Sequence, residues 1–193
     1  IAFAIASRRL SAKKNQGFPD FQAYGVSVLM RYTLRLLTIQ QFQRATSLMC
    51  ACEYVRRQSP EDWGTMQFLI GLWVGMDATP NALRMNSDNY SSAEAVILTS
   101  RKTKNIPDKH NPMQILECPW CGMNLDAYCY EVKEDPDFKL PERLRVYCQN
   151  KKCFFHKNNR VNEDEEVCIP VLTVDEDIYK WCPPLLISTV DKF

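Results

Sequence analysis

The chain of 193 residues lacks several features that would place it in a large functional class. No Gly-Lys-Ser or Gly-Lys-Thr triplet occurs among its six glycines, so it has no phosphate-binding P-loop of its own. No apolar run approaches the ~18 residues that span a bilayer, and we therefore expect no contact with a membrane. The formal net charge is only +1, so any basic surface that binds nucleic acid must be local.

Histidine is also scarce, with two residues, whereas cysteine is abundant, with nine. The cysteine count is odd, and the opening IAFAIASRRL is apolar and then basic, which is the reverse of a secretory signal. Both observations disfavour a disulfide framework, because disulfides belong to oxidising compartments. We therefore expect a cytoplasmic protein whose cysteines are free or bound to a metal.

Four of the cysteines form two pairs with the spacing of a structural zinc site. Cys118 and Cys121 form a C-x-x-C turn, which places two thiolates about one metal diameter apart. Cys148 and Cys153 follow after a spacer and can complete a tetrahedron around the metal. The predicted site is thus a set of four thiolates that binds Zn²⁺.

The alternatives for these cysteines differ in what they require. The second pair is C-x4-C instead of C-x2-C, so Cys129 or His156 could replace one of its members. A redox dithiol would need a thioredoxin-like βαβ context and would leave the second pair unused. A catalytic zinc of the deaminase type would need an H-x-E motif, which is absent from the sequence. Four thiolates close the coordination shell, and the predicted zinc is therefore structural.

The rest of the chain alternates apolar strands with helical stretches, which predicts an α/β fold. The apolar centres of 24–32 and 67–74 are typical of strands buried on both faces. Between them, residues 34–57 carry apolar side chains at helical spacing, so the two strands should be parallel and joined by a helical crossover. A third buried strand is expected at 185–190, and further helices at 1–14 and 91–104.

The segment 169–176 allows two interpretations. Its sequence IPVLTVDE resembles an apolar strand that ends in Asp-Glu, the pattern of a Walker B magnesium site. Thr173 and Glu176 also have the spacing of a capping box, which predicts a helix that runs to Trp181 with acids in its first turn. Pro170 disfavours a central strand, so we favour the helix.

Three of these segments resemble motifs of superfamily 2 helicases. MRYTLRLLTIQQFQRA, residues 30–45, is similar to motif Ia, in which a strand runs into a helix through a turn bearing threonine and arginine. GLWVG, residues 71–75, resembles the glycine-bearing strand end that follows, and LLISTVDKF, residues 185–193, resembles motif Ib. RYTLRLLTIQQ, CPWCG and TVDKF together look like the large helicase subunit of DISARM-type anti-phage defence systems, over nearly the whole chain.

The resemblance implies a partial RecA-like fold, that of P-loop NTPases: a parallel sheet with flanking helices, interrupted by a small zinc-ribbon-like β insertion. Residues 1–105 would form the first part of the lobe, 113–168 the zinc-binding insertion, and 169–193 the return to the lobe. In that family the P-loop precedes this region and the Walker B acids follow it, so both ends are expected to be cuts through a larger protein. ATP and Mg²⁺ would bind only to the complete parent, and this piece should be inactive alone.

The resemblance also implies contact with DNA through the phosphate backbone of one strand. The positions that match the strand-contacting turns are Thr33, Arg35 and Gln40 in the first segment, and Thr189 and Lys192 in the last. Hydroxyl, guanidinium and backbone N–H groups suit phosphate oxygens and read no base. The other implied partners are the rest of the helicase chain and further subunits of the defence system.

The competing function is a non-enzymatic zinc-ribbon module that binds a protein or nucleic-acid partner. Aromatic residues near the cysteines would suit such docking, although residues of this kind more often cover a small zinc core. They are Trp120, Tyr128, Tyr130, Phe154 and Phe155.

Overall fold

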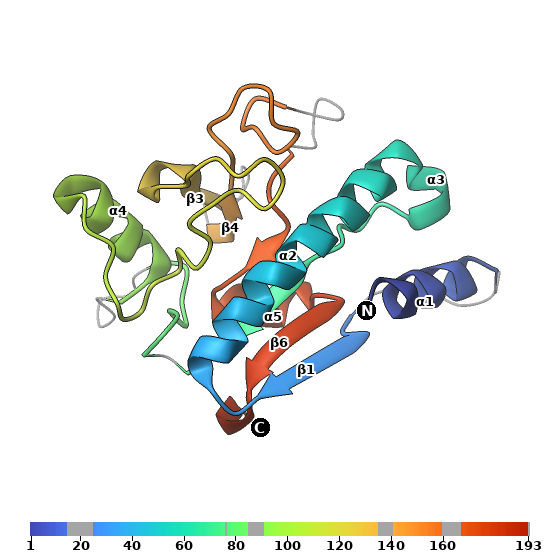
Figure 1. Cartoon of the computed structure of the whole chain (residues 1–193), viewed down its shortest axis with the longest axis horizontal. Helices are drawn as coiled ribbons and strands as arrows, with labels where there is room; N and C mark the ends of the chain where they lie inside the picture. Colours follow the sequence, from blue (N-terminus) through green and yellow to red (C-terminus); the bar gives the residue numbers. More distant parts are fainter. Residues whose placement is uncertain (15–24, 76, 85–90, 135–140, 160–166, 193) are drawn as a thin grey trace.

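The computed structural model describes residues 1–14, 25–75, 77–84, 91–134, 141–159 and 167–192 (Figure 1). Its centre is a four-stranded sheet in the order β1-β6-β2-β5, with every pair of neighbours parallel. The strands are β1 (Val28–Tyr32), β2 (Ile70–Trp73), β5 (Val171–Leu172) and β6 (Leu185–Thr189). The predicted parallel α/β sheet is therefore confirmed, with β5 as a fourth strand: the segment 169–176, for which we favoured a helix, contains both this short strand and the start of the helix.

Helices cover both faces of this sheet. Helix α2 (Arg35–Gln58) follows β1 and leads to β2, and its buried Phe42 and Met49 share a core with Leu185 and Ile187 of β6. Leu186, between those two, packs instead with Leu172 and with Ile178 of α5 (Asp175–Trp181). Alternate residues of β6 thus face opposite layers, as the period of two in a strand requires.

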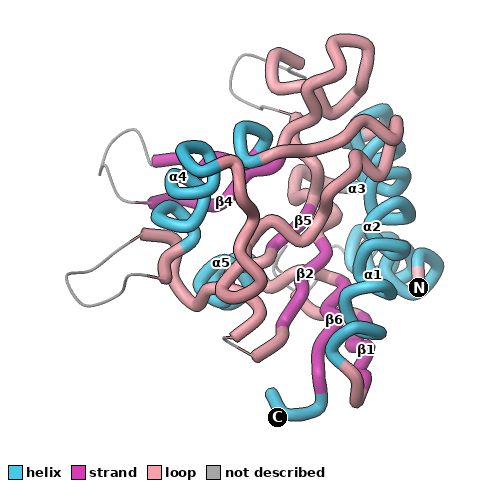
Figure 2. The backbone as a smooth tube through the Cα atoms, turned by 60° about the vertical axis from the view of Figure 1, so that its left-hand side comes forward, coloured by secondary structure: helices cyan, strands magenta, loops and turns pink. Residues whose placement is uncertain are grey.

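The remaining elements lie on two sides of the sheet (Figure 2). Helices α1 (Ala2–Lys14) and α3 (Pro60–Trp63) pack with α2, whereas α4 (Ala93–Thr103) packs beside a two-stranded antiparallel hairpin. The hairpin consists of β3 (Tyr130–Glu134) and β4 (Pro141–Val146), and the short helix η2 (Ala127–Cys129) precedes it. A final turn, η3 (Val190–Lys192), follows β6. Within the described ranges, no helix combines the length and apolar character needed to cross a membrane.

Two expectations about these elements need correction. Strand β1 was expected to be buried on both faces, but its residues alternate between half-buried and exposed, and Leu29 is 43% exposed. The reason is its position, because β1 is an end strand of the described sheet; Tyr24, the expected start, lies outside the described residues. The helix at 175–181 is confirmed, but not its capping box: Val174 is the N-cap, and the Thr173 hydroxyl donates to the carbonyl of Pro112 at 2.7 Å.

A buried carboxylate ties α5 to the hairpin. Oδ2 of Asp177 accepts a hydrogen bond from the backbone N–H of Leu144 in β4 at 3.0 Å, and its Oδ1 has no hydrogen-bond partner among the described residues. Burial is the strongest influence on this acid and raises its pKa to about 7, although the Leu144 N–H and the charge of Arg143 act in the opposite direction. Asp177 therefore binds its proton across the range in which the same acid in an unfolded chain has lost it.

We expect Asp177 to make the chain less stable as the pH rises from about 4 to about 7. In this range the native state holds the proton that the unfolded state, with a pKa near 3.8, has released. Asp177→Asn imitates the protonated acid, so it should flatten this part of the pH profile and raise the free energy of unfolding above neutral pH. Each pKa unit corresponds to about 1.4 kcal/mol, which gives a difference of a few kcal/mol in urea unfolding between acidic and alkaline buffer. An unchanged pH slope in the variant would contradict this role.

Candidate metal centre

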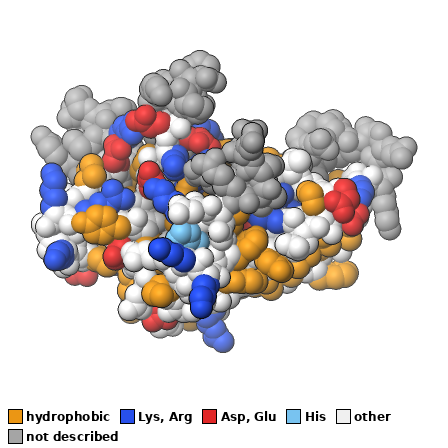
Figure 3. Space-filling view, turned by 90° about the horizontal axis from the view of Figure 1, so that it is seen from above, with side chains coloured by type: hydrophobic (Ala, Val, Ile, Leu, Met, Phe, Trp, Pro, Cys, Tyr) orange, Lys and Arg blue, Asp and Glu red, His pale blue; other side chains and the backbone are white. Residues whose placement is uncertain are grey.

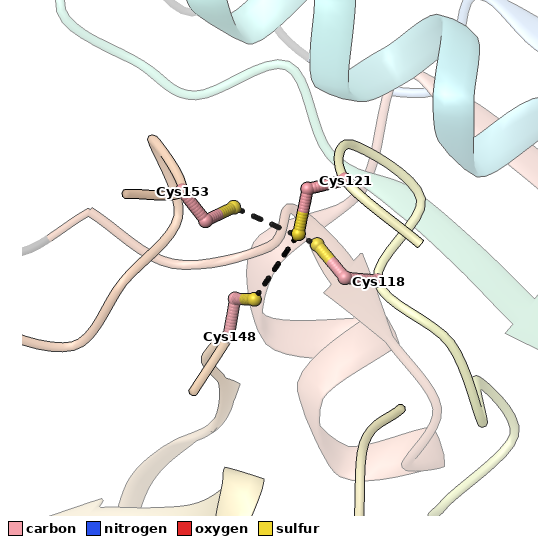
Figure 4. Close-up of side chains that lie close together, drawn as sticks. All are labelled: Cys118, Cys121, Cys148 and Cys153. Carbon is pink, nitrogen blue, oxygen red and sulfur yellow. Dashed lines mark hydrogen bonds between the residues drawn. The ribbon is translucent and has the colours of Figure 1, made fainter. Parts of the chain in front are cut away.

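The structure brings Cys118, Cys121, Cys148 and Cys153 together from two loops, and their side chains converge (Figure 4). All four sulfur atoms lie within 4.8 Å of one another. The Sγ atoms of Cys118 and Cys153 are 3.7 Å apart, and those of Cys121 and Cys148 are 3.5 Å apart. A tetrahedral zinc with Zn–S bonds of about 2.3 Å separates its sulfurs by about 3.8 Å, so this donor set fits such an ion.

The first loop is a tight knuckle around the C-x-x-C pair. The N–H of Cys118 donates to the carbonyl of Met123 at 2.7 Å, and the N–H of Gly122 donates back to the carbonyl of Cys118 at 2.9 Å. Gly122 has a φ of 74°, a left-handed conformation that glycine adopts without a Cβ penalty. The sequence C-x-x-C-G thus closes a turn that holds Cys118 and Cys121 toward the same point.

The second loop forms a wider turn around the C-x4-C pair. The N–H of Cys148 donates to the carbonyl of Phe155 at 2.9 Å, and the N–H of Cys153 donates to the carbonyl of Asn150 at 2.8 Å. The N–H of Asn150 points at Sγ of Cys148, 3.4 Å away, which favours a thiolate there. The two extra residues are therefore accommodated within the turn, and the spacing still yields a convergent pair.

The four thiols cannot all ionise easily without a cation. For Cys121, desolvation is the largest single influence and raises the pKa, but hydrogen bonds from the Met123 backbone, from neighbouring thiols and from Asn150 together lower the pKa to about 7. Burial, together with the negative charge of the other sulfurs, raises the pKa of Cys148 to about 12 and also raises the pKa of Cys153. One thiolate forms readily, and its negative charge opposes ionisation of the other thiols. A bound divalent cation would allow all four thiols to ionise.

The two alternative ligands are not part of this cluster. Cys129 receives a hydrogen bond from Nε2 of Gln149 at 3.2 Å and lies near Asp126, while Nδ1 of His156 accepts from the N–H of Asn158 at 3.2 Å. Neither contributes an atom to the group of sulfurs that lie within 4.8 Å of one another. Three of the four clustered cysteines are buried, and Cys121 is exposed.

Aromatic rings next to the cysteines pack against helix α2. Trp120, next to Cys121, lies 5.1 Å from the ring of Tyr54 on α2, and Phe154, next to Cys153, lies 4.9 Å from the same ring. Phe155 packs edge-on against Trp120 and Phe154. The role of Tyr54 could not be predicted from the sequence, because its partly exposed position on α2 carries no signal of a long-range contact.

The positions predicted to contact DNA lie around the carboxyl edge of the sheet. Tyr32, the last residue of β1, pairs with Thr189, the last residue of β6, so the segments that follow both strands start at the same level (Figure 1). Thr33 and Arg35 are exposed there, and Gln40 is exposed further along α2.

Thr189 and Lys192 are less accessible than that prediction requires. The Thr189 side chain is buried, and Nζ of Lys192 forms a 2.7 Å ion pair with Oδ2 of Asp175 at the start of α5. The lysine also lies 5.6 Å from the centre of the Trp73 ring. In this structure, therefore, Lys192 fastens the turn after β6 to α5, a role that the sequence did not indicate.

Comparison with known proteins gives one informative match. No protein-family model matches the chain. The chain is 36% identical over 194 aligned residues to the DISARM protein DrmA of Bacillus paralicheniformis. The match covers 100% of this chain but only 16% of that protein, so the chain spans about one sixth of the relative's length. The resemblance expected from the motifs is thereby confirmed: over its whole length, the chain is related to one segment of a DISARM DrmA protein.

Proposed function

We propose that this chain is a segment of an ATP-dependent DNA helicase or translocase that acts in anti-phage defence, and that it works in the cytoplasm. Relatedness to DISARM protein DrmA supports the defence role, and the motifs of the sequence support the motor. Residues 1–105 and 169–193 would belong to a RecA-like lobe, and 113–168 would be its insertion. ATP and Mg²⁺ would bind to parts of the parent protein outside this segment. The segment and those parts together would form the complete motor.

The alignment of β1 with β6 is the observation that carries the DNA-binding part of this proposal. Parallel strands present their carboxyl ends at one edge of a sheet, which is where open α/β sheets bind ligands. The register Tyr32↔Thr189 places the turn of Thr33 and Arg35 level with the turn that contains Lys192. A strand of DNA that follows this edge could meet both turns and the N-terminal N–H groups of α2.

The formal net charge of +1 favours a few local contacts over a broad basic face. On the side seen from above, away from the carboxyl ends of the strands, Lys and Arg side chains are scattered among acidic and hydrophobic ones (Figure 3). Among the strand-contacting candidates, Arg35 is exposed, whereas Lys192 is paired with Asp175. Arg35 should therefore supply most of the charge-dependent affinity of this edge.

Arg35→Ala in the complete parent protein should weaken single-stranded DNA binding to a similar extent for all sequences. Loss of one phosphate contact should also reduce the slope of log K against log salt by about 0.7 to 1. Fluorescence anisotropy with labelled oligonucleotides at several salt concentrations measures both quantities. Arg44→Ala is the matched control, because Arg44 is exposed on the same helix two turns further from the strand end. An equal loss in both variants, or a loss confined to one DNA sequence, would count against the proposed contact.

For the metal cluster we propose structural Zn²⁺, bound by Cys118, Cys121, Cys148 and Cys153. The four sulfurs leave no ligand position open for substrate, and the surrounding rings connect the loops to α2. Trp120 and Phe154 contact Tyr54, which gives these aromatics a structural role within the chain. This observation favours the structural role over a free-standing docking module, although Tyr128 is 66% exposed and would suit a partner.

A further inference from the structure

A hollow of about 370 Å³ lies between α4 and the segment that follows it. One side is a single face of the helix, on which Ala95, Thr99 and Thr103, four positions apart, line the hollow together with Val96 and Ser100. Ser91, just before the helix, continues this side. The chain then reverses at Lys104, whose φ is 56°, and returns along the helix. Asn105, Pro107, Lys109 and His110 line the opposite side.

The lining of this hollow is suited to an anion. It contains four hydroxyl groups, one amide, one lysine and one histidine, and no carboxylate. The nearest acids in sequence are Asp108, which is exposed and does not line the hollow, and Glu94, which pairs with Arg84 at 2.8 Å. A ligand in this space would thus meet donors and positive charge without a facing negative group.

One lining group lacks the partner that a purely structural role would give it. Ser100 is only 3% exposed, and its Oγ is buried with no hydrogen-bond partner among the described residues. Helical serines commonly satisfy this group on the carbonyl one turn back, as Thr103 does on the carbonyl of Thr99 at 3.0 Å. An unsatisfied buried hydroxyl costs free energy, and a ligand acceptor in the hollow would remove that cost.

Lys109 and His110 belong to the segment that returns along α4 and ends at Asn111. The N–H of Asn111 donates to the carbonyl of Ala78, and the N–H of Ala93 donates to the carbonyl of Ala82, so one segment contacts both the linker and the first turn of α4. The segment that carries Lys109 and His110 is therefore anchored to residues that also contact the start of α4, where the helix dipole is positive. His110 is held there with a φ of 50°, which is uncommon for a residue other than glycine.

We propose that this hollow binds a phosphate-bearing ligand of mononucleotide size. The phosphate would contact Lys109, His110 and Ser91, while Thr99, Ser100 and Asn105 would hydrogen-bond the sugar and base. The volume lies within the range of small-molecule sites, and Val96 and Pro107 supply apolar contact for a ring. This site lies on different elements from the strand-contacting edge, so it stands independently of the proposed function.

The test is calorimetric titration of the full 193-residue chain, purified with zinc present, using AMP and, as the matched ligand without phosphate, adenosine. We expect AMP to bind at least about tenfold more tightly than adenosine, because charge-assisted hydrogen bonds to phosphate are strong. Lys109→Ala should weaken the binding of AMP by about tenfold and leave the affinity for adenosine unchanged. Ser100→Ala should weaken the binding of AMP without lowering the stability of the fold, since it removes an unsatisfied hydroxyl.

Lys102→Ala is the control, because Lys102 is exposed on α4 but does not line the hollow. A short oligonucleotide with and without a 5′-phosphate distinguishes the sources of the ligand. If the chain prefers the phosphorylated oligonucleotide and Lys109→Ala removes this preference, the ligand of the hollow is the phosphorylated end of a nucleic-acid strand. If AMP binds and neither oligonucleotide does, the ligand is a free nucleotide. Equal affinity for AMP and adenosine, no binding of any phosphate-bearing probe at millimolar concentration, or equal losses in Lys102→Ala and Lys109→Ala would overturn the proposal.

Discussion

Replacement of Cys118 by serine is expected to abolish metal binding and unfold the 113–168 insertion. Structural zinc sites of this kind supply apparent binding free energies of about 10–16 kcal/mol, and the fold of a small insertion depends on them. In this chain the N–H groups of Cys118 and Gly122 are bonded within the knuckle, and Trp120 packs on Tyr54 from its rim. Loss of one sulfur ligand removes the point on which both loops converge.

Two measurements check this result. Elemental analysis should give about one zinc per chain for the unmodified protein and almost none for Cys118→Ser. Limited proteolysis should cut the variant, or the chelator-treated protein, within 113–168 while leaving α2 intact. Cys182→Ser is the matched control, because Cys182 is exposed and does not belong to the cluster. A Cys118→Ser chain that resists protease as well as this control would show that the loops fold without metal.

The metal cluster could be predicted from the sequence because its information is local. A C-x-x-C turn followed by glycine specifies a knuckle whatever surrounds it, and the second pair needs only to face the first. The strands at 70–73 and 185–189 were equally accessible to prediction, since both are apolar runs of the expected length. Strand β5 was visible as an apolar pattern but was set aside, because Pro170 disfavours a central strand; β5 has only two residues and lies at the end of the described sheet order.

The sequence could not show whether the proposed DNA-contacting side chains are accessible, because their accessibility depends on residues far along the chain. Lys192 matched a strand-contacting motif, yet Asp175, which lies at the start of a separate helix, holds its ammonium group. Thr189 lies at a strand end, and the sequence does not indicate that the packed layers bury it. Motif position therefore indicates one edge of the sheet, whose contact with DNA stays a prediction, but it does not indicate which side chains are accessible there.

Glu53 is the clearest example of a residue whose environment the local sequence does not reveal. Glu53, Arg56 and Arg57 have the spacing of an ordinary surface ion pair on a helix, but all three are buried. The carboxylate of Glu53 accepts from Nε and a second nitrogen of Arg56 at 2.9 and 2.8 Å, and from Nε of Arg57 at 2.7 Å. It also accepts the backbone N–H of Phe68 at 2.9 Å, just before β2. This carboxylate therefore joins α2 to the start of a central strand.

Glu53→Gln should cost about 3–5 kcal/mol of unfolding free energy, because it removes the negative charge that pairs with two buried guanidinium groups. The amide keeps the shape of the carboxylate but brings its own N–H donors toward the arginines, so packing is preserved while the charge is lost. Arg56 also donates to the carbonyls of Gly64 and Thr65, and its displacement should loosen the turn between α3 and β2 as well. Urea unfolding followed by circular dichroism measures the loss.

Glu61→Gln is the appropriate control, because Glu61 is an exposed acid on α3 and surface substitutions rarely change stability by more than about 0.5 kcal/mol. The comparison separates burial from charge, since both variants remove one negative charge from nearby positions in the sequence. A loss below about 1 kcal/mol for Glu53→Gln would mean that Arg56 and Arg57 reach water when the charge is removed. The network would then be a consequence of the fold and not one of the interactions that hold α2 against β2.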